Sequence, residues 1–309
     1  MGQKIIKPRI VLSQCFSKAV RYDGGRIWDD FIEKLKKYVE VIEVCPEVGM
    51  GLGIPRERLV VMQRGENKIL FQPDTGRDYT EDIKRFSQAF VKKLPEVDGF
   101  ILKAKSPSCG VGSTKLYIEG VVAKKTYGLF SAFIKETYPF LPLEDEGRLR
   151  DSELRDHFLT RIFALAEVRN LSEDQKALIE FHTRYKYLLL TYNQKVVREL
   201  GRIVARSYLP LKEKIELYKR EFYKAFLKKP SLKKHINTLL HLVGPFSEKI
   251  NTKERRHLHK LIRQFGEGLI SLKVLREILK IFAYRFENVY LLSQKYLEPY
   301  PEELEINKM

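Results

Sequence analysis

Residues 39–46 read Val-Glu-Val-Ile-Glu-Val-Cys-Pro and decide the fold of the first half of the chain. The β-branched residues of this stretch predict a strand, and the strand ends at a cysteine and a proline. Similar short runs occur at 9–12 and 99–103, and amphipathic stretches that predict helices lie between the three. Strands that alternate with helices indicate a mostly parallel sheet covered on both sides. We therefore predict an α/β domain with a Rossmann-like sheet over residues 1–147.

A hairpin is also predicted in the first half of the chain. Two apolar runs, at 59–62 and 69–71, flank the polar segment Arg-Gly-Glu-Asn at 64–67. Apolar runs on either side of a short segment with a glycine are typical of paired antiparallel strands. We therefore expect these two strands to lie side by side within the α/β domain.

The second half of the chain has a different pattern. A linker is predicted at 138–147, where Pro139, Pro142 and an acidic cluster break both periodicities. Beyond it, apolar residues recur at helical spacing and predict an all-α domain over residues 148–309. The predicted helices cover 152–168, 172–200, 212–227, 231–242, 252–265 and 271–297.

Composition restricts the class of protein. The chain has 309 residues, 44% of them apolar, and no run reaches the roughly 18 apolar residues that a membrane span needs. Residues 1–7 lead into the first strand without the apolar region of a signal peptide, so a cytoplasmic protein is expected. Three cysteines cannot all pair, and the cytosol keeps thiols reduced, so we do not expect a framework of disulfide bonds. The formal charge of +17, most of it beyond residue 145, suits a polyanionic partner.

The three cysteines occupy equivalent places in the predicted sheet. Cys15 follows the first strand, Cys45 the second, and Cys109 lies in the loop after the strand at 99–103. Carboxyl ends of parallel strands meet at one edge of a sheet, where open α/β folds bind ligands. We therefore expect the thiols to converge. Three thiolates suit zinc or a [4Fe–4S] cluster, and their spacing does not choose between them; a free cysteine is also often only a small buried apolar residue.

The residues around the cysteines carry a family resemblance. Residues 15–24 (Cys-Phe-Ser-Lys-Ala-Val-Arg-Tyr-Asp-Gly), 43–56 (beginning Glu-Val-Cys-Pro-Glu-Val-Gly-Met-Gly-Leu-Gly) and 102–110 (ending Ser-Pro-Ser-Cys-Gly) together resemble the TudS thiouracil desulfidase domain over about residues 8–140. The helical remainder resembles the YbgA-type domain at 181–187 (Phe-His-Thr-Arg-Tyr-Lys-Tyr). The combination resembles the RudS ribo-thiouridine desulfurases.

The resemblance implies an enzyme that removes sulfur from 4-thiouridine in tRNA, giving uridine and sulfide by non-redox hydrolysis of a C–S bond. It implies a [4Fe–4S] cluster held by Cys15, Cys45 and Cys109, with one iron left open for the substrate sulfur. By motif position, Glu43 would be the catalytic carboxylate and Ser106 the catalytic serine. Whether Glu43 or Glu47 carries the proton stays open. The residues predicted to contact the substrate are Arg21, Tyr22, Asp23, Glu47 and Ser108.

Basic residues of the helical domain predict contacts with RNA. Four of them step by three or four positions between 195 and 206, so they share one helix face. A charged stripe is also the ordinary solvated face of a helix, but beside a site that acts on a nucleobase it fits a cradle for structured RNA. The predicted RNA-binding residues are Lys103, Lys105, Arg184, Lys186, Lys195, Arg198, Arg202, Arg206, Arg255, Arg256, Lys260 and Arg263.

Other functions are compatible with the same residues. A desulfidase of free 2-thiouracil or thionucleosides would use the same cluster but would have no need of a large basic domain. An iron–sulfur sensor that binds RNA would release no sulfide, and a zinc hydrolase would be colourless. The position of the thio-base in tRNA, the oligomeric state and the acceptor of the sulfide are not determined by the sequence.

Overall fold

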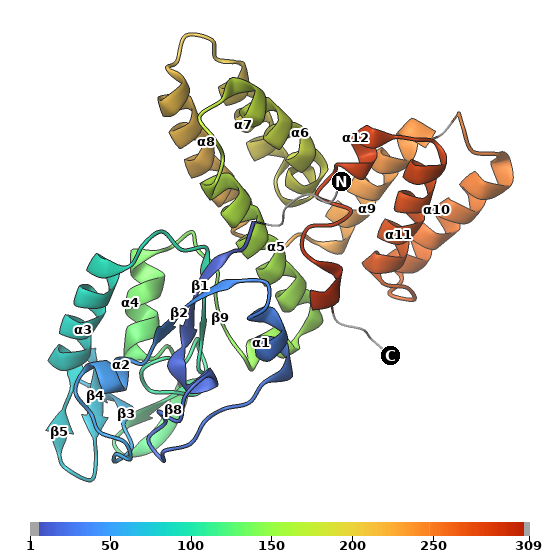
Figure 1. Ribbon diagram of the computed structural model, residues 1–309. Helices are drawn as coiled ribbons and strands as arrows, with labels where there is room; N and C mark the ends of the chain where they lie inside the picture. Colours follow the sequence, from blue (N-terminus) through green and yellow to red (C-terminus); the bar gives the residue numbers. More distant parts are fainter. Residues whose placement is uncertain (1–5, 247, 306–309) are drawn as a thin grey trace. The chain divides into compact units, whose positions relative to one another are not determined.

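A computed structural model describes residues 6–246 and 248–305 of the protein (Figure 1). They form two compact units: one runs up to Ala166 and takes in the described residues from Glu303 onward, and the other is Glu167–Glu302. In this part of the chain no helix is both long enough and apolar enough to cross a bilayer.

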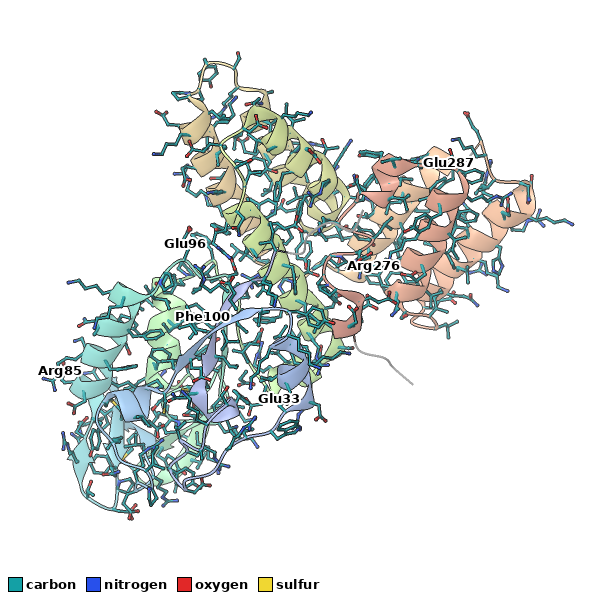
Figure 2. All side chains as sticks on the ribbon, in the orientation of Figure 1. Glu33, Arg85, Glu96, Phe100, Arg276 and Glu287 are labelled. Carbon is teal, nitrogen blue, oxygen red and sulfur yellow. The ribbon has the colours of Figure 1, made fainter. Side chains whose placement is uncertain are left out.

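A parallel sheet lies at the centre of the first unit, with the strand order β2-β1-β6-β9. Val11 of β1 and Phe100 of β6 are fully buried. Phe100 is labelled in Figure 2. Helices cover both faces of the sheet: α3 and α4 lie on one side and α1 on the other (Figure 1). This architecture confirms the predicted parallel α/β fold. The strands are β1 (Arg9–Ser13), β2 (Glu40–Val44), β6 (Gly99–Leu102) and β9 (Leu143–Asp145).

A second sheet, in the order β5-β4-β3-β7-β8, is antiparallel except where β3 pairs with β7. The β3–β4 pair is the predicted hairpin, whereas the other three strands were not predicted. The inner residues Val61, Leu70 and Leu116 are fully buried and join the core beneath the parallel sheet. The strands are β3 (Val60–Arg64), β4 (Asn67–Gln72), β5 (Arg77–Asp78), β7 (Thr114–Ile118) and β8 (Val121–Thr126).

The first unit extends past the predicted boundary at residue 147. β9 lies inside the residues predicted as a linker, and pairs with β6 as the edge strand of the parallel sheet. Helix α5 (Ser152–Arg169) then begins within the first unit, where Ile162 packs so closely that a Cβ added at Gly99 would lie 2.9 Å from its Cγ2. The other helices of this unit are α1 (Asp30–Leu35), α2 (Pro46–Gly49), α3 (Thr80–Lys93) and α4 (Leu129–Thr137).

The second unit is helical, as predicted. The expected apolar stripe of α6 is buried and includes Phe181 and Tyr185, whose stacked rings have centroids 4.4 Å apart. One long helix was predicted over 172–200, but Asn193 has an extended backbone there and its side chain caps the next helix by accepting from the backbone N–H of Lys195 and Val196. The helices are α6 (Gln175–Tyr192), α7 (Gln194–Ala205), α8 (Leu211–Ala225), α9 (Leu232–Val243), α10 (Thr252–Gly266), α11 (Leu272–Arg285) and α12 (Val289–Leu292).

Candidate active site

Three thiols lie at the carboxyl edge of the parallel sheet. Cys15 is in the 3₁₀ turn that follows β1, Cys45 is the N-cap residue of α2 directly after β2, and Cys109 is in the loop between β6 and β7. Since β2, β1 and β6 are adjacent and parallel, these loops emerge side by side. All three cysteines line one cavity of about 770 Å³.

The thiols share one electrostatic environment. Burial raises the pKa of Cys15 to about 12, and the neighbouring Cys45 adds to the rise. Burial also raises the pKa of Cys109 well above its ordinary value, with further contributions from Glu47, Cys15 and Cys45. The negative charge of each thiolate would therefore disfavour ionisation of the neighbouring thiols. Ionised together, the three sulfurs need a positively charged partner between them.

The donors that the cysteine loops bring to the cavity are all thiol sulfurs. Among the residues that the structure describes, no three His, Cys, Asp or Glu side chains are placed to hold a single metal ion. Thiolates are the ligands that hold iron–sulfur clusters, so the donor type of Cys15, Cys45 and Cys109 fits such a cluster.

Glu47 is the carboxylate that faces this cavity. It is buried at the start of α2, and Oε2 accepts a hydrogen bond from Nε of Arg56 at 2.8 Å and lies 2.7 Å from Nη2 in the same ion pair. Oε1 accepts from the hydroxyl of the fully buried Ser108 at 3.0 Å. Of the roughly four acceptor positions of a carboxylate, one on Oε1 remains for a water or a substrate.

Arg56 connects two of the cysteine loops, and the sequence analysis missed it. Its side chain is 6% exposed and donates to the backbone carbonyls of Val20, in the loop after Cys15, and Gly53, in the loop after Cys45. The only trace of this role in the sequence is a basic residue just after a glycine-rich turn. Arg56 therefore positions Glu47 and holds the two loops together.

Ser106 shapes the third loop. Its hydroxyl accepts hydrogen bonds from the backbone N–H of Ser108 and Cys109, at 3.2 and 3.1 Å, and its carbonyl accepts from Thr114 Oγ1 at 2.6 Å. Ser106 also lines the cavity, whereas Ser108, predicted to contact the substrate, lies behind Glu47. The Ser-Pro-Ser-Cys motif thus fixes both the Cys109 backbone and the Glu47 carboxylate.

Glu43 is the carboxylate predicted from motif position to be catalytic. It is absent from the lining of the cavity and makes an ion pair with Lys18 at 2.9 Å. Burial acts to raise its pKa, but hydrogen bonds from Lys18, Ser17 and Gln14 outweigh burial and hold that pKa below its ordinary value. The physical reason is the alternation of a strand: Val44 lines the cavity, so its neighbour Glu43 points to the opposite face.

The remaining predicted residues of the first unit divide between the cavity and its surroundings. Arg21, Tyr22, Lys103 and Lys105 line the cavity. Asp23 does not; it pairs with Arg21 at 3.0 Å. Lys103 donates to Glu146 and to the carbonyl of Ala104, so its charge is already compensated. Cavity residues that the sequence analysis did not single out include Arg58, Lys115, Tyr117 and Lys125.

The predicted RNA-binding residues of the second unit are mostly exposed. Arg184 is an exception: its side chain is 19% exposed and pairs with Glu167, which also pairs with Lys295, so it stabilises the fold. Arg206, the C-cap residue of α7, is half-buried and lies 3.6 Å from Glu199. The exposed members are Lys186, Lys195, Arg198, Arg202, Arg255, Arg256, Lys260 and Arg263.

Gly128 gives a test of how tightly the Cys109 loop is held. A Cβ at this position would lie 2.5 Å from the carbonyl carbon and oxygen of Ser108 and 2.8 Å from the nitrogen of Cys109, and none of these backbone atoms can move alone. We expect Gly128→Ala to lower the free energy of unfolding by about 1–3 kcal/mol, measured by chemical denaturation. Gly53→Ala, whose Cβ would meet its nearest neighbour at 3.7 Å, is the control. Equal stability of the two variants would contradict this packing.

Two family profiles match the chain. The profile of the 2-thiouracil desulfurases matches residues 10–146, which contain all three cysteines, Glu47 and Ser106. The profile described as a protein of unknown function, DUF1722, matches residues 186–301, within the helical unit.

Individual proteins are similar to parts of the chain. The uncharacterized protein YbgA of Escherichia coli (strain K12) is 30% identical over 151 residues, which are 47% of this chain and 89% of YbgA. A solved structure of the [4Fe-4S]-dependent thiouracil desulfidase TudS is 26% identical, with a TM-score of 0.38, and the match covers 47% of this chain and 95% of that one.

Proposed function

The chain belongs to the family that joins a 2-thiouracil desulfurase domain to a YbgA-like DUF1722 domain, and we propose that it removes sulfur from 4-thiouridine in tRNA. The products would be uridine and hydrogen sulfide. The observation that carries this proposal is the convergence of three thiols and one buried carboxylate on a single cavity. Such a site combines soft ligands for iron with a group that can move a proton.

Cys15, Cys45 and Cys109 would hold the cofactor. When bound, a [4Fe–4S] cluster with three protein ligands supplies an iron without one, a Lewis acid suited to a soft sulfur atom. Three thiols whose pKa values are all raised by burial, and by one another or by Glu47, are the groups that gain most from such a cationic partner.

Glu47 would act on the water. Its Oε1 accepts a proton while the water oxygen adds to the carbon that carries sulfur, so a C–O bond forms. Glu47 then returns this proton to the sulfur, and the C–S bond breaks as the added hydroxyl loses its own proton to Glu47 and becomes the carbonyl. The sulfur leaves as hydrosulfide, which takes up that proton to give hydrogen sulfide, so that no electrons are gained or lost. Arg56 and Ser108 hold the carboxylate during this exchange, and Ser106 lines the same cavity within reach of a bound base.

Anaerobic purification followed by incubation with 4-thiouridine-containing tRNA tests this function. We expect about four iron atoms and a similar amount of acid-labile sulfide per chain. We expect the near-ultraviolet absorbance of the thiolated base to disappear as sulfide is released. Protein that contains the cluster but releases no sulfide would favour the sensor, and colourless protein with zinc would favour the hydrolase.

The helical unit would hold the RNA. Lys195, Arg198 and Arg202 are exposed along α7. Arg202 lies 3.6 Å from Glu199, in a surface ion pair of the kind that contributes little to stability. We expect the combined Lys195→Glu, Arg198→Glu and Arg202→Glu variant to raise the Kd for tRNA by on the order of 10–100-fold at physiological salt.

Turnover of the free nucleoside should fall far less in that variant, since the three residues lie in the unit without the cysteines. Lys92→Glu with Lys93→Glu, at the end of α3, is a control that reverses two positive charges instead of three. Equal losses on tRNA and on the nucleoside would reject the division of labour between the units. Deletion from residue 148 is a poor substitute, because it would remove the part of α5 that packs in the first unit.

A further inference from the structure

The cavity has a second wall that the desulfuration chemistry does not use. One side carries the cysteine loops, and the other is formed by the second sheet, with Lys115 and Tyr117 of β7 and Lys125 of β8. Arg58, just before β3, also lines it. A volume of about 770 Å³ lies in the upper range of small-molecule sites. A single pyrimidine ring would leave most of this cavity, and all of the second wall, without a ligand.

Lys115 and Lys125 face each other directly. The register of the antiparallel β7–β8 pair sets Lys115 opposite Lys125, so both ammonium groups project from the same face of the sheet. Like charges directly opposite each other destabilise a strand pair. Within the described residues neither lysine has an ion pair, and the same holds for Arg58 and Lys105. Two opposed cations without a counter-ion fit an anion that bridges them.

The acidic groups of the cavity do not neutralise this wall. Glu47 is the one acidic side chain among the described residues that line the cavity, and the guanidinium of Arg56 already pairs with it. Lys103 is paired with Glu146 and Arg21 with Asp23. Four cations therefore remain for a ligand: Arg58, Lys105, Lys115 and Lys125.

We propose that the β7–β8 face binds the phosphodiester backbone of RNA on both sides of the target nucleotide, an inference that rests on the proposed function. The lysines would contact the flanking phosphates, and Tyr117 on the same face offers a ring on which a neighbouring base can stack. The catalytic unit would thus recognise a strand that enters and leaves the cavity. A single mononucleotide, with one phosphate, would occupy only part of the wall.

The test uses a labelled uridine trinucleotide that carries no sulfur, titrated against the full-length protein by fluorescence anisotropy. We expect Lys115→Gln with Lys125→Gln to raise the Kd on the order of tenfold. The log–log slope of binding against salt should become shallower by about 0.7 for each phosphate that the variant no longer neutralises. Lys92→Gln with Lys93→Gln is the matched control and should bind as the unchanged protein does. An unchanged Kd in the Lys115 and Lys125 variant would overturn the proposal.

Two further outcomes distinguish a wall that binds an RNA strand from a wall that binds another anion. If hexaglutamate competes as well as the trinucleotide, the wall binds acidic peptides and the RNA assignment is wrong. If the double substitution raises KM for 4-thiouridine monophosphate as much as for a thiolated trinucleotide, a single phosphate is recognised and the strand model is wrong. Because binding is measured without sulfur, a protein that binds the trinucleotide but releases no sulfide would contradict the proposed function and leave this inference standing.

Discussion

Glu47→Gln is expected to lower the turnover of 4-thiouridine by about 10²–10⁴-fold, the usual contribution of a positioned general base. Glutamine has the shape of glutamate and keeps one oxygen for Arg56, but it cannot accept a proton at neutral pH. Iron content should stay unchanged, because Glu47 is distinct from the three cysteines that would hold the cluster. The measurement is the rate of sulfide release per cluster, so that any loss of cofactor is corrected for.

Glu43→Gln is the matched control, because the two carboxylates flank Cys45 symmetrically in the sequence, two residues to either side. Glu43 is absent from the lining of the cavity and pairs with Lys18, so we expect its substitution to change turnover far less than the substitution of Glu47 does. A large loss in Glu43→Gln with little change in Glu47→Gln would reverse the assignment.

The thermal midpoint of Glu47→Gln has to be recorded beside its activity. The Arg56 side chain is 6% exposed and would lose its counter-charge, which destabilises a buried pair. A stability loss alone would lower the yield of folded protein. It would not lower the turnover of the molecules that stay folded and carry a full complement of iron.

The position of the cysteines was predictable because it follows from topology. Each cysteine comes after an apolar run, and in a parallel sheet such positions share one edge whatever the details of the loops. The choice of Glu47 over Glu43 that we propose could not be made from spacing, since both are two residues from Cys45. It depends on the face to which the strand turns Glu43 and on Arg56, nine positions beyond Glu47 in the chain.

The β7–β8 hairpin was missed for a local reason, although the β3–β4 hairpin of the same sheet was predicted. β7 and β8 are joined by Glu119 and Gly120, which both have positive φ (49° and 82°), the backbone of a two-residue type I′ hairpin turn. Such turns are usually signalled by Asn-Gly or Asp-Gly, and Glu-Gly carries no such signal. β8 is also exposed along most of its length, so Val121 and Val122 are followed by Ala123 and two lysines without alternation. The wall of the cavity that these strands form could therefore not be predicted from the pattern of apolar and polar residues.

Loss of a single thiol should have the largest effect on the protein. Cys109→Ala is expected to reduce iron from about four atoms per chain to below about one, because two thiolates are too few to hold a cluster in place. Sulfide release should fall by at least about 10³-fold, the several kcal/mol that a Lewis-acidic metal supplies to a transition state. Cys15→Ala and Cys45→Ala should behave alike. Iron, acid-labile sulfide and turnover are measured on anaerobically purified protein.

Val111→Ala distinguishes ligation from packing. Val111 is buried in the same loop, two residues beyond Cys109, and its truncation also removes apolar volume from the core but no sulfur. If Cys109 were only a small buried apolar residue, the two variants would lose similar stability and both would keep their iron. If Cys109 is a ligand, only the cysteine variant loses the cluster. Iron retained in full by any one of the three cysteine variants would contradict the three-thiolate site, and with it the chemistry assigned to the cavity.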